Sequence, residues 1–275
     1  MENFKFADAS IIGTMHDQMG RNNQDFGYLA IEDRYAVGVV ADGCGSTITS
    51  EVGATLGAQW CAEYLRNILL TLGGGYMMDE DHALAILIRM AEFVMTRIHH
   101  SIDRGSFSLQ AGMDMQLLQN NFLFTLVGFI IDNETNSLAF SIGDGYIRVN
   151  NEEIFMEEAN NAPTYIAYSL TPERNKWDLV PKIRYFIPTK ELKHLVVATD
   201  GMQDFAECEG KPFPGKIQEM IPSLEEVLNS EKYFTNPAQL QRLLAKMNPI
   251  TRPSARAHGL LRDDTTIIIA KRFDE

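Results

Sequence analysis

The spacing of apolar residues along the chain predicts runs of strands separated by helices. Continuous or β-branched apolar runs indicate strands, whereas apolar residues three and four positions apart indicate helices. The expected strands are two within residues 26–41, then 122–132, 137–143, 146–150, 183–187, 194–199 and 265–271. The expected helices run from Thr49 or Ser50 to just before Leu72, then over about 80–100, 215–229 and 237–247. Residues 103–120 are ambiguous, and 151–180 suggest an irregular insertion.

The order of these elements predicts an α+β fold. Strands follow strands and helices follow helices, which differs from the alternation of a parallel βαβ fold. We therefore expect antiparallel sheets with helices covering their faces, in a single domain spanning residues 1–275.

Composition and charge argue against nucleic-acid binding, a disulfide or zinc framework and a membrane-spanning segment. Hydrophobic residues make up 45% of the chain and charged residues 22%, which is typical of a globular protein. The 37 acidic residues outnumber the 24 basic ones, giving a net charge of −13 that disfavours nucleic acid as a partner. The three cysteines match no disulfide or zinc pattern. The N-terminus lacks the features of a signal peptide, and the longest apolar run, Phe122 to Ile131, is too short for a bilayer. We expect a cytoplasmic protein without a membrane partner.

Acidic residues stand at the ends of apolar strands. The Asp-Gly pairs are Asp42-Gly43, Asp144-Gly145 and Asp200-Gly201, and Asp263-Asp264 directly precedes the last strand. Any single Asp-Gly pair is most simply a hairpin turn, and Asp144-Gly145 fits that interpretation best. A turn does not explain why every copy follows a buried strand, or why helical segments follow two of them.

The alternative is that these strand ends converge on one cleft. Clustered carboxylates repel one another unless a cation is present, and Mg²⁺ and Mn²⁺ prefer oxygen ligands. Two such ions about 3.5–4 Å apart can activate a water molecule and hold a phosphoryl group. The sequence contains no nucleophile elbow, phosphate-binding P-loop or zinc-protease motif that would indicate a different chemistry.

At these residues the chain resembles the metal-dependent protein phosphatases of type 2C, in order and over nearly its whole length. The similar segments are Asn22-Asn23-Gln24-Asp25, Asp42-Gly43-Cys44-Gly45, Phe124-Thr125, Gly143-Asp144-Gly145, Asp200-Gly201-Met202-Gln203-Asp204 and Asp263-Asp264-Thr265-Thr266. Each motif is weak by itself, but the ordered set is specific. A divergent bacterial branch of the family is the most similar.

The resemblance implies a four-layer αββα sandwich with a metal cleft at one end of two packed sheets. It implies two Mn²⁺ or Mg²⁺ ions and a bridging water as the nucleophile. By position, Asp42 would bridge both ions, the Gly43 carbonyl would hold the second, and Asp200 and Asp263 would bind the first. Asp25 would act through water. Asp144 and Asp204 would help to hold a weaker third ion.

The chain also departs from the family pattern. Gln24 stands where glutamate is usual, Cys44 replaces a histidine proposed as general acid, and Gly145 replaces serine. The phosphate-binding arginine has no clean match. We favour His16 as the phosphate contact and place Arg21 second, although each is also explained as an ordinary core or loop residue.

Three hypotheses follow. The first is a serine/threonine protein phosphatase that acts on phosphorylated proteins, with a cognate kinase as a possible counterpart. The second is a pseudophosphatase that binds phosphoproteins without turnover, for which the changes at Gln24 and Cys44 leave room. The third is a hydrolase of a small phosphorylated metabolite. The retained set of Asp42, Asp200 and Asp263 favours the first.

Overall fold

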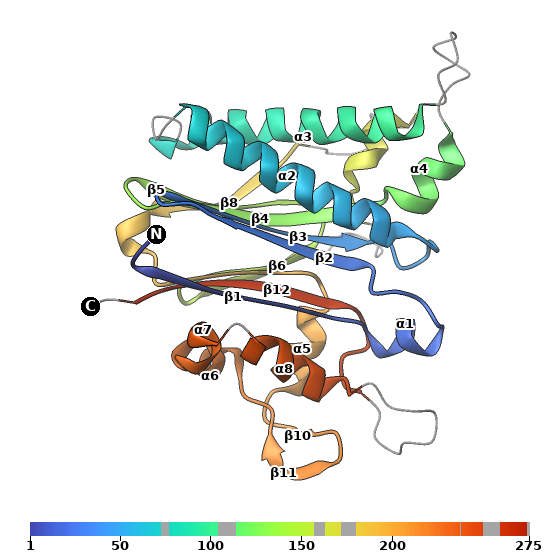
Figure 1. Ribbon diagram of the computed structural model, residues 1–275, viewed down its shortest axis with the longest axis vertical. Helices are drawn as coiled ribbons and strands as arrows, with labels where there is room; N and C mark the ends of the chain where they lie inside the picture. Colours follow the sequence, from blue (N-terminus) through green and yellow to red (C-terminus); the bar gives the residue numbers. More distant parts are fainter. Residues whose placement is uncertain are drawn as a thin grey trace.

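Two antiparallel five-stranded sheets lie face to face, with helices on the outer face of each (Figure 1). The computed structural model describes residues 1–72, 77–103, 114–156, 163–171, 180–236, 238–249 and 259–273. The strand order is β2-β3-β4-β5-β8 in the first sheet and β1-β12-β9-β6-β7 in the second. The arrangement is an αββα sandwich, so the predicted fold class is confirmed.

The first sheet has buried central strands and partly exposed outer strands. Its members are β2 (Asp25–Ile31), β3 (Tyr35–Gly43), β4 (Phe124–Asp132), β5 (Asn136–Ile142) and β8 (Lys182–Pro188). The second sheet joins segments that are far apart in the sequence. Its members are β1 (Phe4–Ile11), β6 (Gly145–Val149), β7 (Glu152–Met156), β9 (His194–Ala198) and β12 (Thr265–Arg272). Apolar residues of both sheets, such as Phe129 and Ile268, form the central core.

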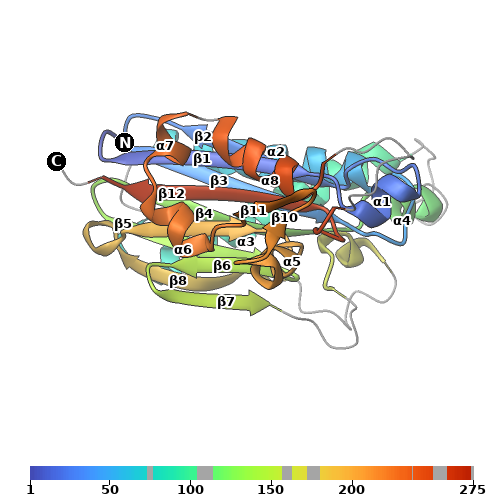
Figure 2. The same cartoon turned by 90° about the horizontal axis from the view of Figure 1, so that it is seen from below.

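Helices form the two outer layers (Figures 1 and 2). Over the first sheet lie α2 (Ser50–Leu72), α3 (Glu80–Ile102) and α4 (Met115–Asn121). Over the second lie α5 (Met202–Cys208), α6 (Leu224–Asn229), α7 (Lys232–Thr235) and α8 (Ala238–Met247). The short helix α1 (Thr14–Gln18) follows β1, and a hairpin of β10 (Pro212–Phe213) and β11 (Lys216–Met220) projects beyond the second helical layer.

Small residues allow α2 to approach the first sheet closely. A Cβ atom on Gly57 would lie 2.3 Å from the ring of Phe124, which is too close for any other residue. Buried Ala54, Ala58 and Cys61 continue this contact along the helix. The first residue of α2, Ser50, donates its hydroxyl hydrogen bond to the Cys44 carbonyl. The position of α2 therefore also fixes the loop that follows Gly43.

Most predicted elements are confirmed, and the exceptions have local causes. The predicted helix over 215–229 is wrong, because residues 216–220 form β11 and only Leu224–Asn229 is helical. Pro222 interrupts the segment, and Ser223 and Glu226 form a capping box that starts the helix afterwards. The strands β1 and β10 and the helices α1, α4, α5 and α7 were not predicted.

Parts of the expected insertion over about 151–180 also have regular structure. Residues 152–156 form β7, and Ile166–Leu170 form a short 3₁₀ helix. Residues 157–162 and 172–179 of this insertion lie outside the described residues, as do 104–113 of the ambiguous segment.

Asp144-Gly145 is not a hairpin turn. The preceding strand β5 pairs with β4 and β8, whereas the following strand β6 pairs with β7 and β9 in the other sheet. The chain therefore crosses between the sheets at this point. Gly143 and Gly145 adopt φ values of 87° and 132°, a region that glycine enters without strain. The crossing carries Asp144 to the end of the sandwich where the other acidic residues lie.

Candidate metal centre

Acidic residues from both sheets meet at one end of the sandwich. In the first sheet Asp25 of β2 lies opposite Asp42 of β3, and Asp42 lies opposite Thr125 of β4. In the second sheet Asp200 follows β9 and Asp263 precedes β12, and these two strands are antiparallel neighbours. The register of each sheet aligns its own acidic residues, and the packing of the two sheets brings together residues more than two hundred positions apart, such as Asp25 and Asp263.

These residues surround a cavity of about 280 Å³. The cavity is lined by Asp42, Gly43, Cys44, Gly45, Ser46, Thr125, Asp144, Pro163, Tyr165, Asp200 and Asp263. The structure thus brings together five of the seven predicted metal ligands. Asp25 is buried beside them, and its negative charge contributes to the raised pKa of Asp42.

Burial and mutual repulsion raise the pKa values of the carboxyl groups in the cluster. Burial, followed by repulsion from neighbouring aspartates, raises the pKa of Asp25 and Asp42 well above the usual value. Burial also raises the pKa of Asp200, against a hydrogen bond with Asp42 that lowers it. The pKa of Asp263 rises to about 6 through burial and the proximity of Asp200. A cation would relieve the repulsion that all of these groups share.

Asp25 links the two sheets and retains a free acceptor. Its Oδ2 accepts a hydrogen bond of 2.6 Å from the Thr199 hydroxyl, which in turn accepts one of 3.0 Å from the Thr266 backbone N–H. Its Oδ1 is buried and has no hydrogen-bond partner among the described residues. An unsatisfied buried carboxylate oxygen is unfavourable, and a water or cation in the adjacent cluster would satisfy it. The donor set of the cluster therefore fits a hard divalent ion.

Asp264 holds the N-terminal segment against the cluster. Its Oδ1 accepts a 2.6 Å hydrogen bond from the Gly13 N–H, and its Oδ2 accepts one of 2.6 Å from the Gln24 N–H. The same Oδ2 lies 2.9 Å from Nδ1 of His16. The sequence contained Asp264 within a motif but gave it no role, because its partners become neighbours only in the folded chain.

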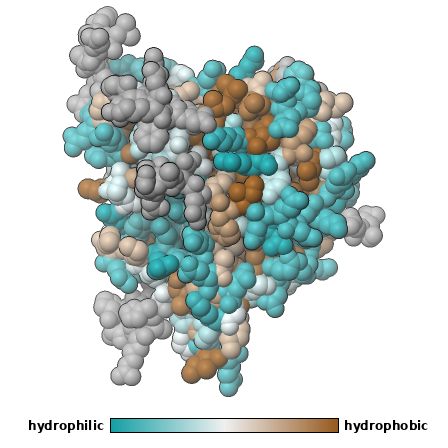
Figure 3. All heavy atoms as spheres, turned by 180° about the vertical axis from the view of Figure 1, so that it is seen from behind, coloured by the Kyte–Doolittle hydropathy of each residue, from teal (hydrophilic) through white to brown (hydrophobic). Residues whose placement is uncertain are grey.

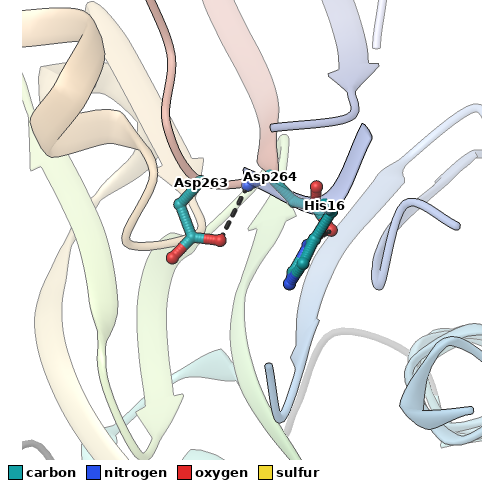
Figure 4. Close-up of side chains that lie close together, drawn as sticks. All are labelled: His16, Asp263 and Asp264. Atoms are coloured by element: carbon teal, nitrogen blue, oxygen red, sulfur yellow. Dashed lines mark hydrogen bonds and ion pairs between the residues drawn. The ribbon is translucent and has the colours of Figure 1, made fainter. Parts of the chain in front are cut away.

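His16 is buried and oriented by Asp264. The oxygen and nitrogen atoms of His16, Asp263 and Asp264 that could bind a cation lie within 4.8 Å of one another. Figure 4 shows the imidazole ring and the Asp263 carboxyl group directed to the same side of the strand end. Both oxygens of Asp264 accept backbone hydrogen bonds, so this residue also holds the N-terminal segment in place. The ring nitrogen Nε2 faces the backbone at Gly45, where an added Cβ atom would lie 3.6 Å from it.

Arg21 supports the loop that follows Asp42. Its guanidinium donates to the carbonyl of Gly45 and, over 3.3 Å, to that of Thr47. The side-chain nitrogen Nε2 of Gln24 also donates to the Thr47 carbonyl, over 3.0 Å. The structure therefore places Arg21 beside the cavity but gives its donors to backbone carbonyls, whereas His16 keeps Nε2 on the side of Gly45.

Asp204 lies on a neighbouring cavity. It accepts hydrogen bonds from the backbone N–H groups of Arg262 and Asp263, over 2.5 and 3.0 Å, and from the Arg262 guanidinium over 3.1 Å. This second cavity, of about 260 Å³, shares Asp200 and Asp263 with the first but does not include Asp144. Asp204 therefore positions the backbone of Asp263, and its role toward a third ion stays a prediction.

Comparisons with known proteins agree with this geometry. The sequence profile of the family described as protein phosphatase 2C matches residues 12–245. The chain belongs to the protein phosphatase 2C family. No curated protein matches the sequence.

Solved structures of protein phosphatase 2C proteins share the fold. A serine-threonine phosphatase 2C from Toxoplasma gondii has a TM-score of 0.54 at 14% identity, with 98% of this chain and 95% of that chain covered. The photosystem II phosphatase PBCP has a TM-score of 0.51 at 14% identity, with 98% and 99% covered. Membership of the protein phosphatase 2C family makes the chain a protein-serine/threonine phosphatase, a phosphoric monoester hydrolase.

The helices that the structure describes include none with the length and hydrophobicity of a membrane-spanning segment.

Tyr165 is a cavity residue that the sequence did not reveal in this protein phosphatase 2C domain. It lies in the segment expected to be irregular, and it is 7% exposed. Burial and the adjacent Cys44 thiol raise the pKa of its hydroxyl far above the usual value, so the group remains a hydrogen-bond donor. Cys44 itself lies 3.1 Å from the Ser46 hydroxyl. Hydroxyl and thiol groups thus line the wall where the family pattern has an imidazole.

Proposed function

We propose that this phosphatase hydrolyses phosphoserine and phosphothreonine in proteins with two Mn²⁺ or Mg²⁺ ions held in the 280 Å³ cavity. The observation that carries the proposal is the convergence of carboxylates from both sheets on that cavity, together with the unsatisfied Oδ1 of Asp25. A site that encloses so many carboxylates is stable at neutral pH only with compensating positive charge.

The residues that would hold the ions follow from their positions in the cavity. Asp42 would contact both ions, the Gly43 carbonyl one of them, and Asp200 and Asp263 the other, with Asp25 acting through water. Asp144 and Asp204 are candidates for a weaker third ion. Bound ions of this type activate water for attack on phosphorus and neutralise charge on the phosphoryl oxygens.

The chain's own side chains position the substrate. Asp264 orients the His16 ring through Nδ1, and in the imidazolium form, which carries a proton on each nitrogen, Nε2–H would donate a hydrogen bond toward a phosphoryl oxygen on the Gly45 side. Tyr165, next to Cys44 in the cavity wall, supplies a second donor. Arg21 keeps the Gly45 to Thr47 backbone in place and contributes positive charge beside the phosphate position. The part of the cavity wall around residues 44–47 therefore holds groups that recognise an anion.

The test is hydrolysis of p-nitrophenyl phosphate and of a phosphothreonine peptide with EDTA, Mg²⁺ or Mn²⁺. We expect turnover only with metal, and a loss of about 10²- to 10³-fold in Asp200→Asn, because one charged ligand is replaced by a neutral amide. Asp81→Asn, at an exposed site on α3, is the matched control and should behave as the parent protein.

The other outcomes separate the competing hypotheses. Metal binding in calorimetry without turnover of either substrate would contradict the enzyme and support a phosphoprotein-binding pseudophosphatase. Strong selectivity for one small phosphorylated compound over phosphopeptides would instead support a metabolite hydrolase.

His16→Ala should raise the KM for a phosphopeptide by about tenfold and leave metal affinity unchanged, because it removes a contact to the phosphate and no predicted ligand. The control is His99→Ala, at an exposed position of α3. Steady-state kinetics and a manganese titration measure the two quantities. An unchanged KM would contradict the role of His16 and move phosphate binding to Arg21 or to another residue.

A further inference from the structure

A groove lies far from the metal cleft, on the outer side of the second helical layer. It runs between α8 and the projecting β10–β11 hairpin, and α7 closes one side. Its volume is about 290 Å³. The lining residues are Phe213, Glu219, Met220, Pro222, Lys232, Tyr233, Gln239, Arg242, Leu243 and Lys246. We call it the hairpin groove.

The hairpin groove has an apolar floor and an apolar rim. Phe213, Tyr233 and Leu243 are buried and form the floor. At the rim Met220 is 56% exposed, and Ile217 on the same hairpin is 84% exposed. Figure 3 shows hydrophobic surface at the projecting end of the molecule where the hairpin lies. Large apolar side chains held this far out are a sign of a contact surface.

Positive charge gathers around this apolar surface. Residues 239, 242, 243 and 246 follow helical spacing, so α8 presents Arg242 and Lys246 on the face that lines the groove. Lys232 and Lys246 extend over the rings of Tyr233 and Phe213, at 4.6 and 5.4 Å from the ring centres. The chain as a whole has a net charge of −13, so the positive charge of this groove is opposite in sign to the charge of the whole protein.

The acidic residue within the groove is already paired. Oε2 of Glu219 lies 3.3 Å from the Nζ atoms of both Lys216 and Lys246. Arg242 and Lys232 have no ion-pair partner among the described residues. The groove therefore has cationic groups available for an external anion, above a floor that accepts apolar side chains.

We propose that the hairpin groove binds an acidic, extended segment of a partner protein. Carboxylate or phosphate groups of the segment would contact Arg242 and Lys232, and an alternating apolar residue would pack against Met220. All five residues of β11 are exposed, so its backbone is also accessible to an added strand. A concave groove fits a peptide better than a bilayer surface.

The experiment measures fluorescence anisotropy with two labelled probes, a short peptide of alternating glutamate and leucine and the same peptide with one phosphoserine. Arg242→Glu should weaken binding of the preferred probe by about tenfold. Arg89→Glu makes the same change in charge at an exposed site on α3, in the opposite helical layer, and should leave affinity unchanged. Comparison of the two probes distinguishes carboxylate from phosphate recognition.

Three results would overturn the proposal. They are equal losses in Arg242→Glu and Arg89→Glu, no binding of either probe up to about 1 mM, and Arg242-dependent binding to phosphatidylserine vesicles with none to the peptides. Hydrolysis of p-nitrophenyl phosphate should be the same in both variants, because neither residue lines the metal cleft. With the glutamate–leucine peptide, which has no phosphate to hydrolyse, the test of the groove is therefore independent of the proposed catalytic function.

Discussion

Asp42→Asn should abolish metal-dependent turnover and, in the absence of metal, make the protein more stable. The Asp42 carboxyl group is surrounded by Asp25, Asp144, Asp200 and Asp263, whose charges together with burial raise its pKa well above the usual value. An amide of the same size removes one member of this repulsive group, while it also removes the central predicted ligand. Activity should fall by about 10²- to 10³-fold.

The gain in stability should depend on pH. The aspartates of the cluster titrate at about 3.8 when unfolded and higher when folded, with Asp263 at about 6. Above pH 4 the unfolded chain therefore binds fewer protons than the folded one, so the free energy of unfolding decreases as pH rises through the folded pKa values. The metal-free parent protein should melt at a lower temperature at pH 8 than at pH 5. Mn²⁺ should reverse this order, because it binds the ionised groups.

Thermal unfolding of both proteins in EDTA checks the stability prediction. Asp42→Asn should unfold a few degrees above the parent at pH 8, since about 1 kcal/mol corresponds to roughly 2–4 °C for a chain of this size. At pH 5, where the parent carboxyls are partly protonated, the two should be closer. A variant that melts below the parent at pH 8 would show that the carboxylates do not repel one another in the folded state.

Asp264→Ala should destabilise the protein by about 3–5 kcal/mol, because it removes the acceptor of two buried backbone N–H groups and the partner of His16. The Gly13 N–H and the Gln24 N–H would be left without their acceptor inside the fold. Chemical denaturation measures the loss. Gln24 directly precedes Asp25, so a shift of its backbone would also displace Asp25. The concentration of metal needed for half-maximal turnover should therefore rise as well.

Asp264→Asn separates charge from hydrogen bonding. An asparagine oxygen can still accept from Gly13, but its NH₂ group cannot accept from Gln24, so an intermediate loss of stability is expected. Asp81→Ala on α3 controls for the loss of an exposed aspartate. Equal stability of Asp264→Ala and the parent protein would contradict the supporting role of this residue.

The fold could be predicted where the local pattern and the tertiary structure agree. The buried strands β3 and β4 have continuous apolar sequences, and α3 has helical spacing between a capping Asp79 and a basic last turn. The strand β1 was missed because it alternates alanine with polar residues, and its identity as a strand depends on pairing with β12. The segment Lys216–Met220 contains good helix formers, but it lies between Gly215, with positive φ, and Pro222.

The candidate site shows the same division. The Asp-Gly pairs marked strand ends, and their common position in the chain order indicated a shared cleft. The supporting groups could not be found in this way. Asp264 contacts Gly13 and Gln24 across about 250 and 240 positions, and Thr199 contacts Asp25 across 174. No local pattern records such contacts, because they arise from the packing of two sheets.

The strand order of the second sheet bears on how the protein is synthesised. In this sheet β12 lies between β1 and β9, so Phe4 pairs with Arg272. The meander from β2 to β5 can form while the ribosome is still translating, because its contacts are between neighbours in the sequence. The strands β9, β6 and β7 can pair with one another earlier, but β1 joins this sheet only through β12, and Asp263 directly precedes β12. We therefore expect the acidic cleft to be complete only after β12 has left the ribosome, so that a nascent chain that stalls before this point should lack the proposed metal site.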